Sequence, residues 1–117
     1  MNSLVYSKSK RFSIRIVRLY SFLRREKREF VMSNQLLRSG TSIGANLAEA
    51  VCAISRADFL SKVYIALKEA METLYWLELL HETDFLSDGQ FISLHKDAEE
   101  LRRMLSSITK TMKDQDT

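Results

Sequence analysis

One stretch of the chain constrains its fold more than any other, because it combines a helical apolar repeat with two glycines. It spans residues 36–50 and reads LLRSGTSIGANLAEA. At about 100° per residue, one face of this helix gathers Leu36, Gly40, Ile43, Gly44, Leu47 and Val51. Glycine costs roughly 1 kcal/mol in a helix interior relative to alanine. Two glycines one turn apart, with Ala48 one turn further, therefore predict a groove into which another helix packs closely.

The opposite face of the same helix is polar. It carries Arg38, Asn46 and Glu49, which excludes a lipid environment. Because Arg38 and Glu49 are eleven residues apart, we expect them to reach different neighbours. The stretch is interpreted as the central helix of a bundle in water, and it carries no chemical motif of its own.

Composition favours long helices in a single domain. The 117 residues include three glycines and no proline, and a chain of this length builds one core. Cys52 is the single cysteine, and its small apolar neighbours predict a buried thiol rather than a nucleophile. The chain begins with polar and basic residues and has no run of about 20 apolar residues. We therefore expect a cytoplasmic protein with no membrane contact.

Helix signals divide residues 1–117 into four segments, at about 5–27, 31–53, 56–83 and 88–113. Ser55 with Asp58, and Ser87 with Gln90, have the spacing of helix-capping boxes. The last segment has a heptad seam of Phe91, Leu94, Ala98, Leu101, Leu105, Ile108 and Met112. Short connections force neighbouring helices to run antiparallel. The predicted fold is an all-α, antiparallel up-down-up-down four-helix bundle.

The third helical segment is apolar on two sides. One face carries Leu60, Val63, Tyr64, Leu67, Ala70, Met71, Leu74 and Leu77. The opposite face carries Ile65, Trp76, Leu79 and Leu80. Because one bundle cannot bury both faces, the second face predicts a homo-oligomer in which those four residues lie in or near the subunit contact.

Positive charge is concentrated at the start of the chain. Residues 1–28 contain nine Lys or Arg and one acidic residue, a net charge of +8, which leaves −5 for the remainder. Five of these cations form one stripe on the first helix: Lys8, Arg11, Arg15, Arg18 and Arg25. Such a stripe is either solvated or follows a phosphate backbone. Ile14 and Phe22 lie among the arginines, and we interpret them as part of a subunit contact rather than as a base-stacking platform.

Catalytic and metal-binding patterns are not present in the sequence. Di-metal sites in helical bundles use a Glu-x-x-His motif on each of two helices. Glu78 and His81 have this spacing, whereas His95 has no Glu three residues before it. Phosphate-binding glycine loops and nucleophile elbows are also missing. We expect no metal, no cofactor and no enzymatic activity.

The string QLLRSGTSIGANLAEA, residues 35–50, resembles the signature of the bacterial 23S rRNA intervening-sequence proteins, in which the usual form reads like QLRRSA-x-SI-x-ANIAEG. The family's downstream S…F…IA…E…E…WL pattern matches Ser55, Phe59, Ile65, Ala66, Leu67, Glu69, Glu72, Trp76 and Leu77. The resemblance covers about residues 12–86. The chain departs from the pattern at Gly40, where Ala is common, and at Ala50, where Gly is usual.

This resemblance implies a four-helix bundle without established catalysis, encoded in some bacteria by insertions within 23S rRNA genes. The chain is also similar to the accessory variability proteins of diversity-generating retroelements. That similarity implies a pentameric ring with a basic surface that associates with nucleic acid and a reverse transcriptase.

Two hypotheses follow. The protein is a homo-oligomeric RNA- or DNA-binding module of low sequence specificity, or it is a self-associating scaffold whose basic stripe pairs with acidic helices of neighbouring subunits. An exposed stripe favours the first hypothesis, and a neutralised stripe favours the second.

Overall fold

The computed structural model describes residues 3–116, which form four α-helices and no strand. Their bounds are α1 Ser3–Arg25, α2 Met32–Ala50, α3 Arg56–Glu82 and α4 Asp88–Asp116. The molecule measures 48 × 21 × 21 Å, in keeping with a longest helix of 29 residues at about 1.5 Å per residue. The all-α prediction is confirmed, and the protein is a four-helix bundle.

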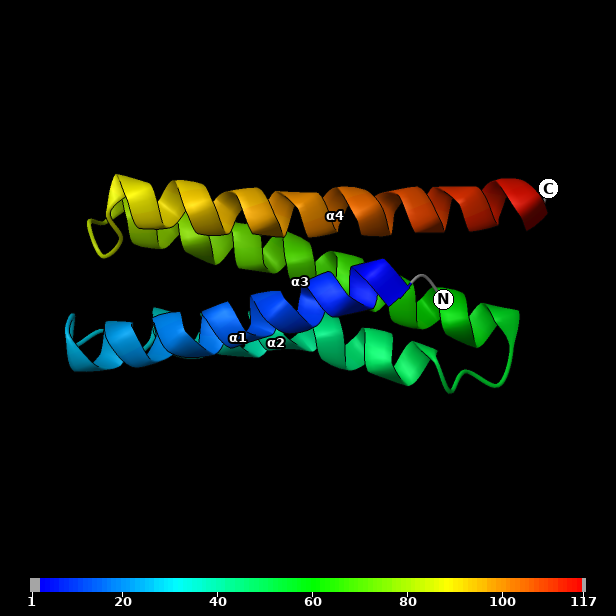
Figure 1. Ribbon diagram of the computed structural model, residues 1–117, viewed down its shortest axis with the longest axis horizontal. Helices are drawn as coiled ribbons and strands as arrows, with labels where there is room; N and C mark the ends of the chain where they lie inside the picture. The colour runs from blue at the N-terminus through cyan, green and yellow to red at the C-terminus, as the bar shows by residue number, and fades with distance from the viewer. Residues whose placement is uncertain (1–2, 117) are drawn as a thin grey trace.

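Each helix packs against the helices that precede and follow it, and α4 also packs against α1. In the diagonal pairs, α1 with α3 and α2 with α4, no two Cα atoms of the described residues come within 8 Å of each other. Figure 1 shows the chain reversing its direction at each of its three connections. Because α1 and α3 are diagonal, their outer faces point to opposite sides of the rod.

Local capping starts the last two helices. The Ser55 hydroxyl accepts a hydrogen bond of 3.0 Å from the Asp58 amide, and the Asp58 carboxylate accepts one of 3.1 Å from Ile54. Ser87 and Gln90 form a reciprocal box, with side-chain to amide distances of 3.1 and 3.0 Å. Both predicted capping signals are confirmed.

The second helix begins with a side-chain cap that was not predicted from the sequence. The carboxylate of buried Glu29 accepts hydrogen bonds from the amides of Val31, Met32 and Ser33 at 2.7 to 3.1 Å. The Ser33 hydroxyl donates back to the Glu29 carbonyl at 2.9 Å. A carboxylate at the positive end of a helix dipole is favourable. Glu29 therefore fixes the turn between α1 and α2.

The two glycines of α2 lie where α1 crosses it. A Cβ built on Gly40 would sit 2.9 Å from both Cγ atoms of Ile16, and one on Gly44 would sit 3.3 Å from the Ser9 hydroxyl. Ile43 and Leu47 of the same face are fully buried. The close neighbour of this groove is thus α1, and the missing side chains let the two helices approach.

Part of the predicted α2 face lies outside the core. Val51, Cys52 and Ala48 are exposed, so the prediction of a buried thiol at Cys52 is wrong. The reason is that α2 ends at Ala50, earlier than the predicted residue 53. The residues that follow leave the helix in an exposed connection.

The two faces predicted for α3 are also partly wrong. Leu80, expected on the outer face, is fully buried, whereas Met71, expected in the core, is 54% exposed. Because α3 packs against both α2 and α4, its buried sector is wide and displaced from the predicted one. Leu80 falls inside that sector and Met71 falls outside it.

None of the helices, taken over the described residues, has both the length and the apolar character that crossing a membrane would require.

Candidate nucleic-acid interface

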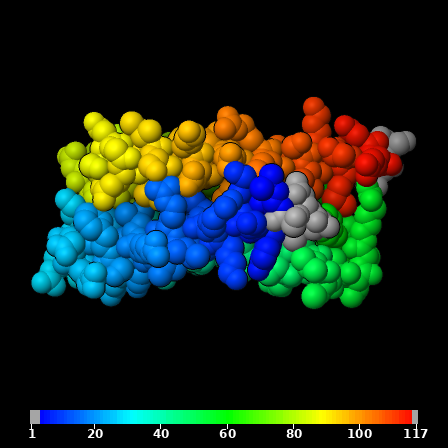
Figure 2. Space-filling view, viewed as in Figure 1, coloured from blue at the N-terminus to red at the C-terminus, as the bar shows by residue number. Residues whose placement is uncertain are grey.

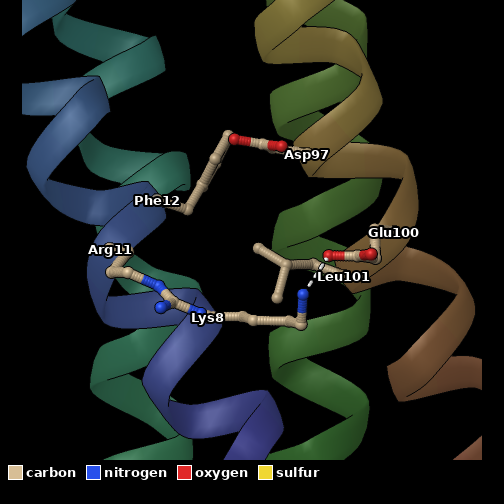
Figure 3. Close-up of a pocket in the computed structure, with 6 residues that line it drawn as sticks. All are labelled: Lys8, Arg11, Phe12, Asp97, Glu100 and Leu101. Carbon is tan, nitrogen blue, oxygen red and sulfur yellow. Dashed lines mark hydrogen bonds and ion pairs between the residues drawn. The ribbon is translucent and has the colours of Figure 1, made fainter.

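The basic stripe of α1 is divided by its neighbour α4. Lys8 Nζ lies 2.9 Å from Glu100 Oε1, and Figure 3 shows this side chain reaching across from α1 to α4 with Arg11 beside it. Arg15 Nη1 lies 2.5 Å from Asp97 Oδ2, and Arg15 Nη2 donates to the Ser93 hydroxyl at 2.8 Å. The hydrogen bond from Lys8 holds the pKa of Glu100 below its ordinary value. Two of the five stripe cations are therefore neutralised within the chain.

The other three cations of the stripe lie outside these ion pairs, and one of them, Arg11, lines a small pocket between α1 and α4 beside Lys8 (Figure 3). Arg11, Arg18 and Arg25 are exposed, and none of them forms an ion pair with another residue of the described part of the chain. Lys10 is exposed on the same helix. Figure 2 shows the face of the molecule that α1 crosses, with α4 along its upper edge. We call these four exposed residues, Arg11, Arg18, Arg25 and Lys10, the outer cations.

The two apolar residues predicted among the arginines differ in their surroundings. Ile14 is 45% exposed and lies on the outer face of α1, together with exposed Val17. Phe22, in contrast, packs against the core cluster. The structure thus leaves Ile14 available for a contact and assigns Phe22 chiefly to the bundle itself.

A polar network joins α2 to α3 on the surface. Arg38 forms ion pairs with Glu69, at 3.0 Å, and with Glu72. The indole of Trp76 donates to the Glu72 carboxylate at 3.0 Å. Hydrogen bonding from Trp76, followed by that from Arg38, lowers the pKa of Glu72, and hydrogen bonding to Glu72 raises the pKa of Arg38. This network gives Arg38 a role in pairing the two helices and makes Trp76 part of it.

Of the two other polar residues predicted on this face of α2, Glu49 pairs with α3 and Asn46 bonds within α2. Glu49 lies 3.4 Å from Lys62 on α3, and Asn46 donates to the carbonyl of Ser42 at 2.8 Å. Arg38 and Glu49 thus have different partners, as the sequence predicted.

The outer face of α3 carries an apolar patch, which we call the α3 patch. Met71 and Tyr75 are its most exposed members, at 54% and 57%, and Ile65, Trp76 and Leu79 are partly buried beside them. The Tyr75 and Trp76 rings meet edge to face at 5.0 Å between centroids. Of the four interface residues predicted on α3, three remain at the surface, and Leu80 does not.

The two histidines lie near the connection between α3 and α4. His81 Nε2 is 2.7 Å from Asp88 Oδ1, and His95 Nε2 is 3.4 Å from Glu78 Oε2. The Phe91 ring separates them, stacking on His81 at 4.2 Å between centroids. No group of three or more potential metal ligands occurs within residues 3–116.

The fold and these surfaces define a class of protein: a helical bundle whose distinctive features are outward-facing cations on one helix and an apolar patch on the diagonal helix. The chain belongs to the 23S rRNA-intervening sequence protein family, whose model matches residues 1–107. No curated protein matches the chain.

A solved structure supports this assignment. The crystal structure of a protein with unknown function from the S23 ribosomal protein family of Bacteroides thetaiotaomicron is similar to this chain at a TM-score of 0.90 and 57% sequence identity. The match covers 91% of this chain and 98% of that one. The two chains therefore share their fold.

Proposed function

We propose that the protein is a non-enzymatic, homo-oligomeric module that binds RNA or DNA through the outer cations of α1. The observation that carries the proposal is the division of the basic stripe. Lys8 and Arg15 form ion pairs with carboxylates of α4. Arg11, Arg18 and Arg25 are exposed and have no ion-pair partner in the described part of the chain. Three exposed cations at seven-residue spacing on one straight helix suit a polyphosphate backbone.

Binding of this kind depends little on base sequence. Contacts to phosphates position a protein on nucleic acid, whereas contacts to base edges specify sequence. The outer cations are long, flexible side chains on the surface of the helix, and no base-reading motif accompanies them. We therefore expect low specificity and a strong dependence on salt.

Self-association is proposed to use the α3 patch. Because α1 and α3 are diagonal, a contact through α3 leaves the outer cations exposed. The similarity to accessory variability proteins extends this proposal to a pentameric ring with a reverse transcriptase as a protein partner. The composition of the chain extends it to a protein of the cytoplasm. A closed ring needs a second, different surface on each copy, and Ile14 with Val17 is the apolar pair that α1 offers.

A second candidate function is the self-associating scaffold without a nucleic-acid role. The ion pairs of Lys8 with Glu100 and of Arg15 with Asp97 favour it, because they show that α1 cations pair with helical carboxylates. If the outer cations pair with acidic helices of neighbouring copies in the same way, none of them remains for phosphate.

The test is to replace Arg11, Arg18 and Arg25 together by Gln and to measure RNA binding by fluorescence anisotropy over a range of salt concentrations. We expect weaker binding and a flatter salt slope, because log K changes with log salt by about 0.7 to 0.9 per neutralised phosphate. The matched control replaces Lys96, Arg103 and Lys110, exposed cations on α4, by Gln. It changes the net charge equally and should leave binding nearly unchanged.

The outcomes separate the two functions. If the wild-type protein has no affinity for RNA or DNA at low salt, the result supports the self-associating scaffold. If the two triple variants weaken binding equally, the contact is a general effect of charge and not a property of α1.

A further inference from the structure

We propose that the connection between α1 and α2 is a site for single-stranded nucleic acid, in which Phe30 stacks on an unpaired base while Arg25, Lys27 and Arg28 contact the adjacent phosphates. This inference rests on the proposed nucleic-acid function. It specifies that the ligand is single-stranded and names the residue that recognises it.

The connection between α1 and α2 carries a cluster of positive charges. Residues 24–30 read RREKREF, four cations and two carboxylates. The Glu29 carboxylate is buried and accepts hydrogen bonds from three backbone amides. Its negative charge therefore interacts with the start of α2. Glu26 is the remaining acidic residue of the segment. Arg25, Lys27 and Arg28 are exposed and have no ion-pair partner among the described residues.

An aromatic ring stands beside these cations. Phe30 is 44% exposed. The Arg24 guanidinium carbon lies 4.9 Å from the centroid of the Phe30 ring and 5.2 Å from that of Tyr20. Arg24 thus supports the ring from one side. The exposed part of Phe30 can accept a base, since every base offers a planar face.

The platform is held in place by the fold of the turn. The Glu29 amide donates to the Leu23 carbonyl at 3.0 Å, and the Glu26 amide donates to the Phe22 carbonyl at 2.8 Å. Arg28 has the left-handed backbone, with φ of 54°, that reverses the chain. Together with the Glu29 cap, these bonds fix Phe30 before any ligand arrives, which lowers the entropic cost of binding.

The geometry selects unpaired strands. In a duplex the bases stack on one another and their faces are closed, so an external ring on a rigid turn can stack only on a flipped, terminal or single-stranded base. Figure 2 shows this connection, in light blue, at one end of the rod. A strand can therefore reach Phe30 and continue along the outer cations of α1.

The experiment compares three labelled probes: a 12-nucleotide single-stranded RNA without self-complementarity, the same sequence as a duplex, and an abasic strand of equal length. Phe30→Ala should weaken binding of the single strand by about 5- to 100-fold, the range that loss of one stacked base produces. Abasic binding should stay unchanged, because the cations are intact, and duplex binding should change much less than single-strand binding, because only the terminal base pairs of a duplex have a free face. Phe30→Tyr should restore the single-strand preference.

Val31→Ala is the matched control, because Val31 is an exposed apolar neighbour without a ring, and it should leave all three affinities unchanged. Phe30→Trp supplies an independent readout, since a base stacked on the new indole should quench its fluorescence relative to a protein that has Trp76 alone.

The inference is overturned if Phe30→Ala changes the three probes equally or changes none of them. In that case, a loss of binding in the Arg11, Arg18 and Arg25 triple variant would show that the proposed function stands without the stacking site. If no probe binds the wild-type protein at low salt, the proposed function itself fails.

Discussion

At the scale of single residues, Gly44 is the position where the packing of α1 on α2 is most directly tested. We expect Gly44→Leu to lower the free energy of unfolding by about 1 to 3 kcal/mol or more, because it overpacks a closed contact. Ser9 and Ser13 hydroxyl oxygens lie 3.3 and 3.5 Å from the site of its Cβ, and the Ser9 backbone carbon lies 3.7 Å away. Chemical denaturation measures the change.

Gly89→Leu is the control for this prediction. A Cβ at Gly89 meets no atom within 4 Å, so the same substitution should be nearly neutral there. Equal effects at the two positions would show that the contact with α1 does not limit the side chain at Gly44.

Glu29 allows a second prediction at this scale. Glu29→Ala removes the acceptor of three amide hydrogen bonds and should destabilise the protein by about 1 to 3 kcal/mol, the cost of leaving such donors unsatisfied. The control is Glu26→Ala, an exposed residue of the same turn, which should change stability by less than about 0.5 kcal/mol. An unfolding midpoint that does not move in Glu29→Ala would contradict the capping role.

At the scale of the helices, the Arg38, Glu72 and Trp76 network should make the pairing of α2 with α3 sensitive to acid. The folded-state pKa of Glu72 is lowered from its ordinary value of 4.5. The stabilisation from a lowered pKa is complete above the unfolded value and is lost as the pH falls through the folded one. We therefore expect the loss to begin below about pH 4.5.

Thermal melts between pH 2 and pH 7 test this prediction. Glu72→Gln should flatten the acid limb of the stability curve, and Trp76→Phe should flatten it in part, because it removes the largest cause of the shift. Glu82→Gln, an exposed change on the same helix, should leave the curve as it is. A Glu72→Gln curve that coincides with the wild-type curve would rule out this contribution.

At the scale of the whole molecule, the α3 patch should hold copies together. The double variant Met71→Glu with Tyr75→Glu introduces two charges into its most exposed part and should shift the protein toward its monomer mass of 13.6 kDa. Light scattering after size-exclusion chromatography measures the mass. Ile92→Glu, at an exposed apolar residue of α4, is the control and should preserve the oligomer.

A wild-type protein that elutes and scatters as a monomer at micromolar concentration would contradict self-association. A double variant that keeps the wild-type mass would place the contact elsewhere on the surface. Circular dichroism of the double variant should show the helical content of the wild-type protein, since Met71 and Tyr75 lie outside the core.

The sequence by itself determined those features that depend on near neighbours in the chain. The capping boxes of Ser55 and Ser87 rest on hydrogen bonds within a few residues. The heptad seam of α4 is likewise visible in the spacing of neighbouring apolar residues. For that reason the number of helices, and most of their bounds to within a few residues, could be read from spacing alone. The string RREKREF also places an aromatic residue beside four cations, but the exposure of Phe30 depends on how the turn folds.

Only the tertiary structure decided which side chains the bundle uses and which it leaves outside. Lys8 and Glu100 are 92 positions apart, so no periodicity in α1 predicts that this cation is neutralised while Arg11 is not. Leu80 is buried and Met71 exposed because α3 packs against two neighbours at once, and Cys52 is exposed because α2 ends before it. Periodicity defines the faces of a helix, but the positions of the neighbouring helices determine which of those faces meets water.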